Sequence, residues 1–232
     1  MDDPGHAAGG WKFPAPAVKI CGLTRREDAE LAAAEGAGYL GIVLVQGTPR
    51  ALSISEGRKV VSGLGVPVVG VLSNPSLGEA VTSILELGAS VIQLHGEEDP
   101  GFIRTLREEG PWSIWKALRV RDAGTLSREM APFSPFVDGI LLDSWHPEKP
   151  GGTGKSFSWA DVESLRNDFS PGLRLIAAGG LRPDNVQEAV RRLRPHVVDV
   201  SSGVEKRPGI KSRRKVAAFI RAVAGTGKEG AG

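Results

Sequence analysis

One pattern occurs eight times along the chain, and it constrains the fold more than any other feature of the sequence. In each repeat a short apolar run ends at a glycine or a polar residue, and an amphipathic stretch follows it. The eight apolar runs cover residues 18–21, 39–45, 66–72, 91–94, 113–118, 137–143, 173–178 and 197–200. Strands that alternate with helices form parallel sheets with right-handed crossovers. The pattern therefore predicts an α/β fold of eight strand–helix units.

Eight such units can close into a barrel or open into a doubly wound sheet. The chain has 232 residues and no visible long insertion, which favours a single (β/α)8 (TIM) barrel. The runs 41–45 and 66–72 are apolar at nearly every position, as expected of strands buried on both faces of a parallel sheet. A dinucleotide-binding fold is disfavoured, because the first strand leads into Cys21–Thr24 and not into a glycine-rich fingerprint.

The expected barrel domain covers residues 17–224, and segments of different composition flank it. Residues 1–16 are rich in Gly, Ala and Pro without periodicity, so we expect a disordered leader there and a flexible tail over residues 225–232. Capping-box patterns at Thr24–Glu27 and Ser76–Glu79 support two helix starts. Helices are expected to begin near residues 24, 55, 76, 99, 122, 158, 183 and 211.

The composition argues against several classes of partner. The formal net charge of +2 gives no strong field toward nucleic acid or a membrane surface. No apolar run approaches the ~18 residues of a membrane span, and the N-terminus lacks the apolar core of a signal peptide. Cys21 is the single cysteine, which excludes an intrachain disulfide and suits the cytoplasm. The basic cluster at 211–215 is expected to be a solvated helix face, and no Cys/His spacing indicates a metal site.

Glycines that follow the last strands suggest a phosphate site. Gly179 and Gly180 follow the seventh apolar run, and Ser202 and Gly203 follow the eighth. Backbone N–H groups at this end of a TIM barrel frequently bind phosphate. The alternative is that these glycines only turn the chain, but two such turns at neighbouring strands favour phosphate. Gly154, in the glycine-rich loop after the sixth run, is assigned to the same site.

Cys21 and Asp143 are the candidates for proton transfer. Active sites of TIM barrels lie at the carboxyl ends of the strands, where both residues stand. A lone cysteine is more often an inert buried residue, but a position between a strand end and a helix start favours a thiolate. Asp143 ends an apolar strand at the barrel mouth, where a carboxyl group can act as a general acid. Arg50, which follows a Thr-Pro turn, is either a ligand for a substrate carboxylate or a surface arginine.

The sequence resembles the phosphoribosylanthranilate isomerase family from residue 18 to about residue 220. The combination of Lys-Ile-Cys-Gly in the first segment with Asp-Val-Ser-Ser-Gly in the last is highly specific. Related barrels of the histidine pathway have an aspartate in place of Cys21. The matching segments are Val18–Thr24, Gly47–Arg50, Val69–Leu72, Gln93–Gly96, Leu141–Asp143, Gly151–Lys155, Ala178–Leu181 and Val198–Glu205.

The resemblance implies an isomerase of tryptophan biosynthesis that needs no cofactor or metal. It would convert the small molecule N-(5-phosphoribosyl)anthranilate to 1-(2-carboxyphenylamino)-1-deoxyribulose 5-phosphate by an Amadori rearrangement, as a monomer or homodimer. Cys21 would be the general base and Asp143 the general acid. The substrate-binding residues would be Arg50, Gln93, His95 and Asp199. Two segments depart from the family pattern: 44–47 lacks an aromatic residue, and the loop 144–149 is longer than expected.

Two other functions remain possible from the sequence. One is a different phosphosugar isomerase on the same barrel, such as a histidine-pathway or bifunctional enzyme, against which Cys21 argues. The other is a barrel that only binds phosphorylated ligands, against which the joint presence of Cys21 and Asp143 argues.

Lys19 is expected to form a buried ion pair beneath the site. Side chains alternate along a strand, so Lys19 should face the barrel interior one layer below Cys21. A buried ammonium needs a partner, and the neighbouring eighth strand has a single carboxylate, Asp199. The positive charge would lower the pKa of Cys21. The alternative is that Lys19 extends to solvent at the bottom of the barrel.

Overall fold

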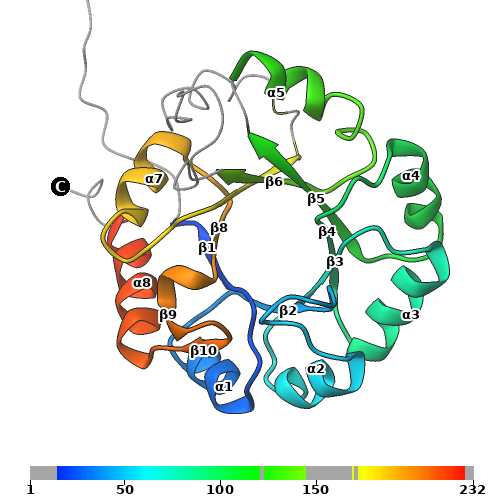
Figure 1. Ribbon diagram of the computed structural model, residues 1–232. Helices are drawn as coiled ribbons and strands as arrows, with labels where there is room; N and C mark the ends of the chain where they lie inside the picture. Colours follow the sequence, from blue (N-terminus) through cyan, green and yellow to red (C-terminus); the bar gives the residue numbers. More distant parts are fainter. Residues whose placement is uncertain (1–14, 121–122, 145–168, 170–171, 228–232) are drawn as a thin grey trace, which may run out of the picture.

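The computed structural model describes residues 15–120, 123–144, 169 and 172–227, and within them eight strands close a parallel barrel in chain order (Figure 1). Each predicted apolar run contains or overlaps one strand, so the predicted TIM barrel is confirmed. The strands are β1 (Ala17–Ile20), β2 (Tyr39–Val43), β3 (Val68–Leu72), β4 (Val91–Leu94), β5 (Ser113–Val120), β6 (Gly139–Ser144), β7 (Arg174–Ala178) and β8 (Val197–Val200).

The described helices form a ring outside the strands, as Figure 1 shows in a view along the barrel axis. They are α1 (Arg26–Ala34), α2 (Ile54–Val61), α3 (Leu77–Leu87), α4 (Pro100–Glu108), α5 (Ala123–Met130), α7 (Val186–Leu193) and α8 (Arg213–Gly225). After β8, a short 3-10 helix η2 (Ser202–Val204) leads into a small antiparallel hairpin of β9 (Glu205–Arg207) and β10 (Ile210–Lys211). The hairpin was not predicted. Thr226, just beyond α8, is buried, so packed structure reaches past the boundary expected at residue 224.

The predicted capping boxes have different outcomes. The Ser76–Glu79 box is present at the start of α3, but the predicted box at Thr24 is wrong. α1 begins with Arg25 as its N-cap, because the Thr24 hydroxyl donates instead to the carbonyl oxygen of Gly209 at 2.5 Å. A capping box at Ser53–Glu56 was missed, although its sequence has the Ser-x-x-Glu pattern.

Apolar side chains fill the lower part of the barrel interior. Val69, Val91, Leu141 and Ile176 pack together with Trp115 in a buried cluster separate from the larger one that joins strands to helices. Layers of this kind make a TIM barrel a packed core and not a pore. Side chains alternate along each strand, so the residue two positions after each member of this cluster also points into the barrel. It lies one layer closer to the barrel mouth. Polar residues at these positions are therefore brought to one place.

Some sequence-based predictions fall outside the described residues. These are Gly154, the loop after Asp143, the helix expected near residue 158, and most of the two expected tails, residues 1–14 and 228–232. In the part of the chain that is described, no helix combines the length and apolar character needed to cross a bilayer.

Candidate active site

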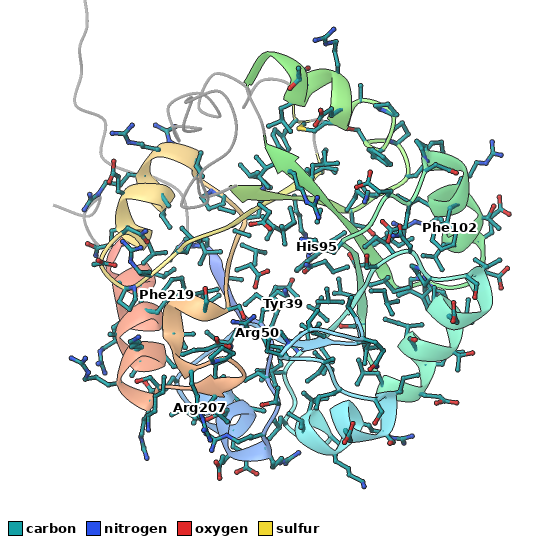
Figure 2. All side chains as sticks on the ribbon, in the orientation of Figure 1. Tyr39, Arg50, His95, Phe102, Arg207 and Phe219 are labelled. Atoms are coloured by element: carbon teal, nitrogen blue, oxygen red, sulfur yellow. The ribbon has the colours of Figure 1, made fainter. Side chains whose placement is uncertain are left out.

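Most of the predicted site residues line one pocket of about 230 Å³ at the carboxyl ends of the strands. In Figure 2 the labelled His95 and Arg50 lie inside the ring of helices, whereas Phe102 and Phe219 lie in that ring. Arg50 is not part of the pocket wall, and Gly154 is outside the described residues. The predicted residues in the wall are Cys21, Gln93, His95, Asp143, Gly179, Gly180, Asp199, Ser202 and Gly203.

The candidate phosphate loops have backbone geometry that depends on glycine. Gly179 and Gly180 have φ values of 80° and 62°, in the left-handed region that other residues rarely adopt. A Cβ atom on Gly203 would lie 1.9 Å from the carbonyl oxygen of Leu181, so glycine also allows the β7 and β8 loops to touch. The two loops thus lie next to each other, and both form part of the pocket wall.

The predicted Lys19–Asp199 ion pair is present beneath Cys21. The β1–β8 register places the two residues opposite each other, and Lys19 Nζ lies 2.8 Å from Asp199 Oδ2. The Lys19 side chain is fully buried, so the alternative in which it extends to solvent is excluded. A Cβ atom on Gly41 would lie 3.0 Å from Cys21 Sγ and 3.1 Å from Lys19 Cε. Gly41 therefore makes room for the thiol and the ammonium together.

The electrostatic environment of Cys21 only partly matches the prediction. Burial raises the pKa of the Cys21 thiol, and the Lys19 charge opposes this effect without cancelling it. Lys19 thus acts in the predicted direction, but the pKa of Cys21 lies above its ordinary value. Burial acts to lower the pKa of Lys19, but its interactions with Asp199 and Cys21 together outweigh that effect and raise the pKa. The lysine therefore stays charged beneath the thiol.

Asp143 lies on the other side of the pocket, next to His95. His95 Nε2 is 3.5 Å from Asp143 Oδ2, and their side chains are 31% and 38% exposed. On its other edge, His95 Nδ1 lies 3.2 Å from Gln93 Nε2. β7 and β8 separate Asp143 on β6 from Cys21 at the end of β1. A carboxyl group and a thiol thus face one pocket from two sides.

The guanidinium of Arg50 is held by an acidic residue that the sequence did not single out. Arg50 Nε donates to Glu205 Oε1 at 2.8 Å, and Nη2 donates to Oε2 at 2.6 Å. A Cβ atom on Gly22 would lie 2.4 Å from Arg50 Cδ, so the side chain packs directly on the residue after Cys21. Burial acts to raise the pKa of Glu205, but hydrogen bonds from Arg50 and Lys211 keep it below its usual value. Arg50 is thus held in a bidentate ion pair and is not a freely exposed surface arginine.

The prediction that the basic cluster at 211–215 is a solvated helix face is wrong for Lys211. Its side chain is buried, and its ammonium donates to the carbonyl oxygen of Cys21 at 2.5 Å and to Glu205 Oε1 at 2.9 Å. Burial lowers the pKa of Lys211. Only Arg213 and Arg214 of this cluster are exposed as expected. The β9–β10 hairpin folds back over the end of β1, which the charge pattern could not indicate.

Two further polar atoms in the pocket wall have no partner. Asp199 Oδ1 and the Ser201 hydroxyl are buried without a hydrogen bond among the described residues. Buried polar groups without partners are costly, so both are suited to contact a ligand. Ser201 was missed as a site residue, although it lies directly after the eighth apolar run. The described residues contain no group of three or more His, Cys, Asp or Glu side chains that could hold a metal ion.

Comparison with known proteins identifies the family. The family model of N-(5'phosphoribosyl)anthranilate (PRA) isomerase matches residues 18–222. The N-(5'-phosphoribosyl)anthranilate isomerase of Trichlorobacter lovleyi is 42% identical over 209 residues, which cover 88% of this chain and 96% of that one. The enzyme of the same name from Rubrobacter xylanophilus is 41% identical, with 88% and 97% covered.

Solved structures agree in fold as well as in sequence. The phosphoribosyl anthranilate isomerase of Thermotoga maritima is 34% identical, with a TM-score of 0.79 over 90% of this chain and 99% of that one. A phosphoribosyl anthranilate isomerase in complex with reduced 1-(o-carboxyphenylamino)-1-deoxyribulose 5-phosphate is 31% identical, with a TM-score of 0.78 and the same coverage. The chain therefore belongs to the N-(5'-phosphoribosyl)anthranilate isomerase family.

Proposed function

We propose that this protein isomerises N-(5-phosphoribosyl)anthranilate to 1-(2-carboxyphenylamino)-1-deoxyribulose 5-phosphate in tryptophan biosynthesis. The observation that carries the proposal is one pocket lined by both Cys21 and Asp143, with the glycine loops after β7 and β8 in its wall. A thiol base and a carboxylic acid on two sides of a small pocket suit an internal proton-transfer reaction. Membership of the family supports the same reaction.

The chemistry requires two proton transfers at different atoms of the sugar. Asp143 donates a proton to the ribose ring oxygen while the ring C–O bond breaks and the anilino nitrogen forms a Schiff base with C1. Cys21 then removes the proton from C2, and its bonding electrons neutralise the Schiff base to give an enolamine. The enolamine tautomerises to the ketone as C1 gains a proton and the C2 hydroxyl loses one. The reaction is an isomerisation and needs no oxidant or reductant.

Groups in the pocket wall, together with Arg50 outside it, would hold the two ends of the substrate. Backbone N–H groups of Gly179–Gly180 and Ser202–Gly203 would bind the phosphate. Arg50 donates to Glu205 through Nε and Nη2, and it would present its third guanidinium nitrogen, Nη1, to the anthranilate carboxylate. Asp199 Oδ1, which has no hydrogen-bond partner among the described residues, would accept a hydrogen bond from a sugar hydroxyl.

A fluorescence assay with purified protein tests this function. Phosphoribosylanthranilate should lose its fluorescence in the presence of the protein, with a chelator present and no nucleotide added. Binding without turnover would support the barrel that only binds phosphorylated ligands. Turnover of a histidine-pathway aminoaldose in place of phosphoribosylanthranilate would support the other phosphosugar isomerase.

We also propose that the protein acts in the cytoplasm, as a monomer or homodimer, on a small molecule and not on nucleic acid or a membrane. The support for a reducing compartment is Cys21, a buried free thiol. A related structure from Thermotoga maritima is that of monomers derived from a dimeric phosphoribosylanthranilate isomerase.

Gly180→Val should raise KM for the phosphorylated substrate more than it lowers kcat. Valine strains the backbone at a φ of 62° and would move the amides that we assign to phosphate. Gly65→Val is the matched control, because Gly65 has a φ of 68° with no atom within 4 Å of its Cβ position. Steady-state kinetics and thermal unfolding of both variants separate the two effects. Equal KM values in the two variants would place the phosphate elsewhere.

A further inference from the structure

Four side chains form a series of polar contacts across the barrel mouth, from the ammonium beneath Cys21 to Asp143. Lys19 Nζ lies 2.8 Å from Gln93 Oε1. Gln93 Nε2 lies 3.2 Å from His95 Nδ1, and His95 Nε2 lies 3.5 Å from Asp143 Oδ2. Gln93 is only 1% exposed, so its amide is held by protein groups and has little contact with solvent.

The donor and acceptor roles of the groups in this series follow from its first member. A lysine ammonium has three donors and no acceptor, so the Gln93 atom that faces it must be the carbonyl oxygen. The Gln93 amide nitrogen therefore faces His95, and it can only donate. His95 Nδ1 must then accept, because a proton on Nδ1 would place two donors against each other. The remaining imidazole proton is on Nε2, which faces the Asp143 carboxyl group.

We propose that His95 is a positioning residue for Asp143, kept in the Nε2–H tautomer by Gln93 and Lys19, and that neither His95 nor Gln93 binds the substrate. The inference rests on the proposed function, in which Asp143 is the general acid. It differs from the sequence-based expectation, which assigned Gln93 and His95 to substrate binding. The contacts favour positioning because the buried Gln93 amide is already engaged on both sides.

The tautomer determines which oxygen of Asp143 can deliver the proton. Oδ2 is the carboxyl oxygen that lies 3.5 Å from Nε2, so we assign it the acceptor role toward the Nε2–H group and place the transferable proton on Oδ1. After the ring opens, the same N–H group faces the new carboxylate and stabilises its charge. A hydrogen bond to a charged group is stronger than one to a neutral group, so His95 helps the carboxylate more than the acid. Ring opening is therefore the step that His95 accelerates.

Two substitutions of His95 test this geometry. A glutamine side-chain nitrogen reaches the place of Nε2 and can still donate to Asp143, whereas an asparagine nitrogen reaches only the place of Nδ1. We expect His95→Gln to keep kcat within about threefold and His95→Asn to lower it about tenfold, both with little change in KM. A merely structural role would not distinguish the two variants by kcat alone. A higher KM with unchanged kcat in both would make His95 a substrate ligand and overturn the proposal, as would unchanged kinetics in both.

Nitrogen NMR of protein with labelled histidine shows which tautomer His95 adopts, and this measurement does not depend on turnover. The His95 signal, identified by its loss in His95→Gln, should show a protonated Nε2 and an unprotonated Nδ1. In Gln93→Met, which removes the donor to Nδ1, the other tautomer should appear. A protonated Nδ1 in the unsubstituted protein would refute the inference even if the isomerase activity is present. Absence of activity with the expected tautomer would instead count against the proposed function.

Discussion

Activity is expected to fall about 10²- to 10⁴-fold when Cys21 is replaced by serine, and by a similar factor when Asp143 is replaced by asparagine. A serine hydroxyl is a far weaker acid than a thiol, so it cannot provide the anion that removes the C2 proton. An asparagine amide has no proton to transfer to the ring oxygen. Steady-state kinetics give kcat, and thermal unfolding shows whether each variant is folded.

The pH profile distinguishes loss of the base from general damage. Burial raises the pKa of Cys21 above its ordinary value, and the base acts in its deprotonated form. Because the reaction needs Cys21 deprotonated and Asp143 protonated, the rate of the unsubstituted protein should have two limbs against pH, one of which belongs to the thiol and lies above the ordinary range of a thiol pKa. Any residual activity of Cys21→Ser should lack the limb that belongs to the thiol. A folded Cys21→Ser protein with an unchanged rate would show that another group removes the C2 proton.

Asp138→Asn is the matched control for the acid. Asp138 immediately precedes β6, which carries Asp143, and its carboxylate accepts hydrogen bonds from Arg107 and from the backbone N–H of Ile114. It is not among the residues of the pocket wall. Asp138→Asn should lower stability and keep kcat, whereas Asp143→Asn should lower kcat and keep stability. Equal kcat values in the two variants would show that Asp143 is not the general acid.

The barrel and the central part of the site could be predicted because both follow from periodicity. Apolar runs of strand length at regular spacing determine eight parallel strands, and strand ends then meet at one face. This places Cys21 and Asp143 in one pocket without any knowledge of loop structure. The alternation of side chains along β1 similarly predicts the depth of Lys19 and its pairing with Asp199 across the β1–β8 register.

The contacts around Arg50 could not be predicted because they depend on a loop. Glu205 and Lys211 lie in the β9–β10 hairpin, which has no periodic signal and whose direction is set by tertiary packing. The same hairpin brings Gly209 to the Thr24 hydroxyl and thereby removes the expected capping box of α1. A basic cluster in sequence indicated a solvated face, and only the folded hairpin shows that Lys211 is buried.

Lys19→Met is expected to lower the free energy of unfolding by about 3–5 kcal/mol, because it leaves the Asp199 carboxylate buried without its partner. Asp199 raises the pKa of Lys19, so the lysine is charged at all pH values below its ordinary pKa. Its contribution to stability is fully present there and would be lost only when pH rises through the higher pKa of the folded state. Chemical unfolding near neutral pH measures the full effect.

The double variant Lys19→Met/Asp199→Asn distinguishes two effects of the ion pair. One is the effect of the Lys19 charge on the pKa of Cys21, and the other is the contribution of the pair to the stability of the barrel. Replacing both members removes the unpaired carboxylate, so the double variant should recover a large part of the lost stability. The Lys19 charge lowers the pKa of Cys21, whereas burial and the Asp199 charge raise it. Lys19→Met should therefore shift the limb of the rate profile that belongs to the thiol to higher pH, and the double variant should shift it less. If Lys19→Met unfolds too readily to assay, the double variant still reports the change in the profile. A stable Lys19→Met protein with an unchanged pH profile would show that the buried pair neither supports the barrel nor influences the thiol.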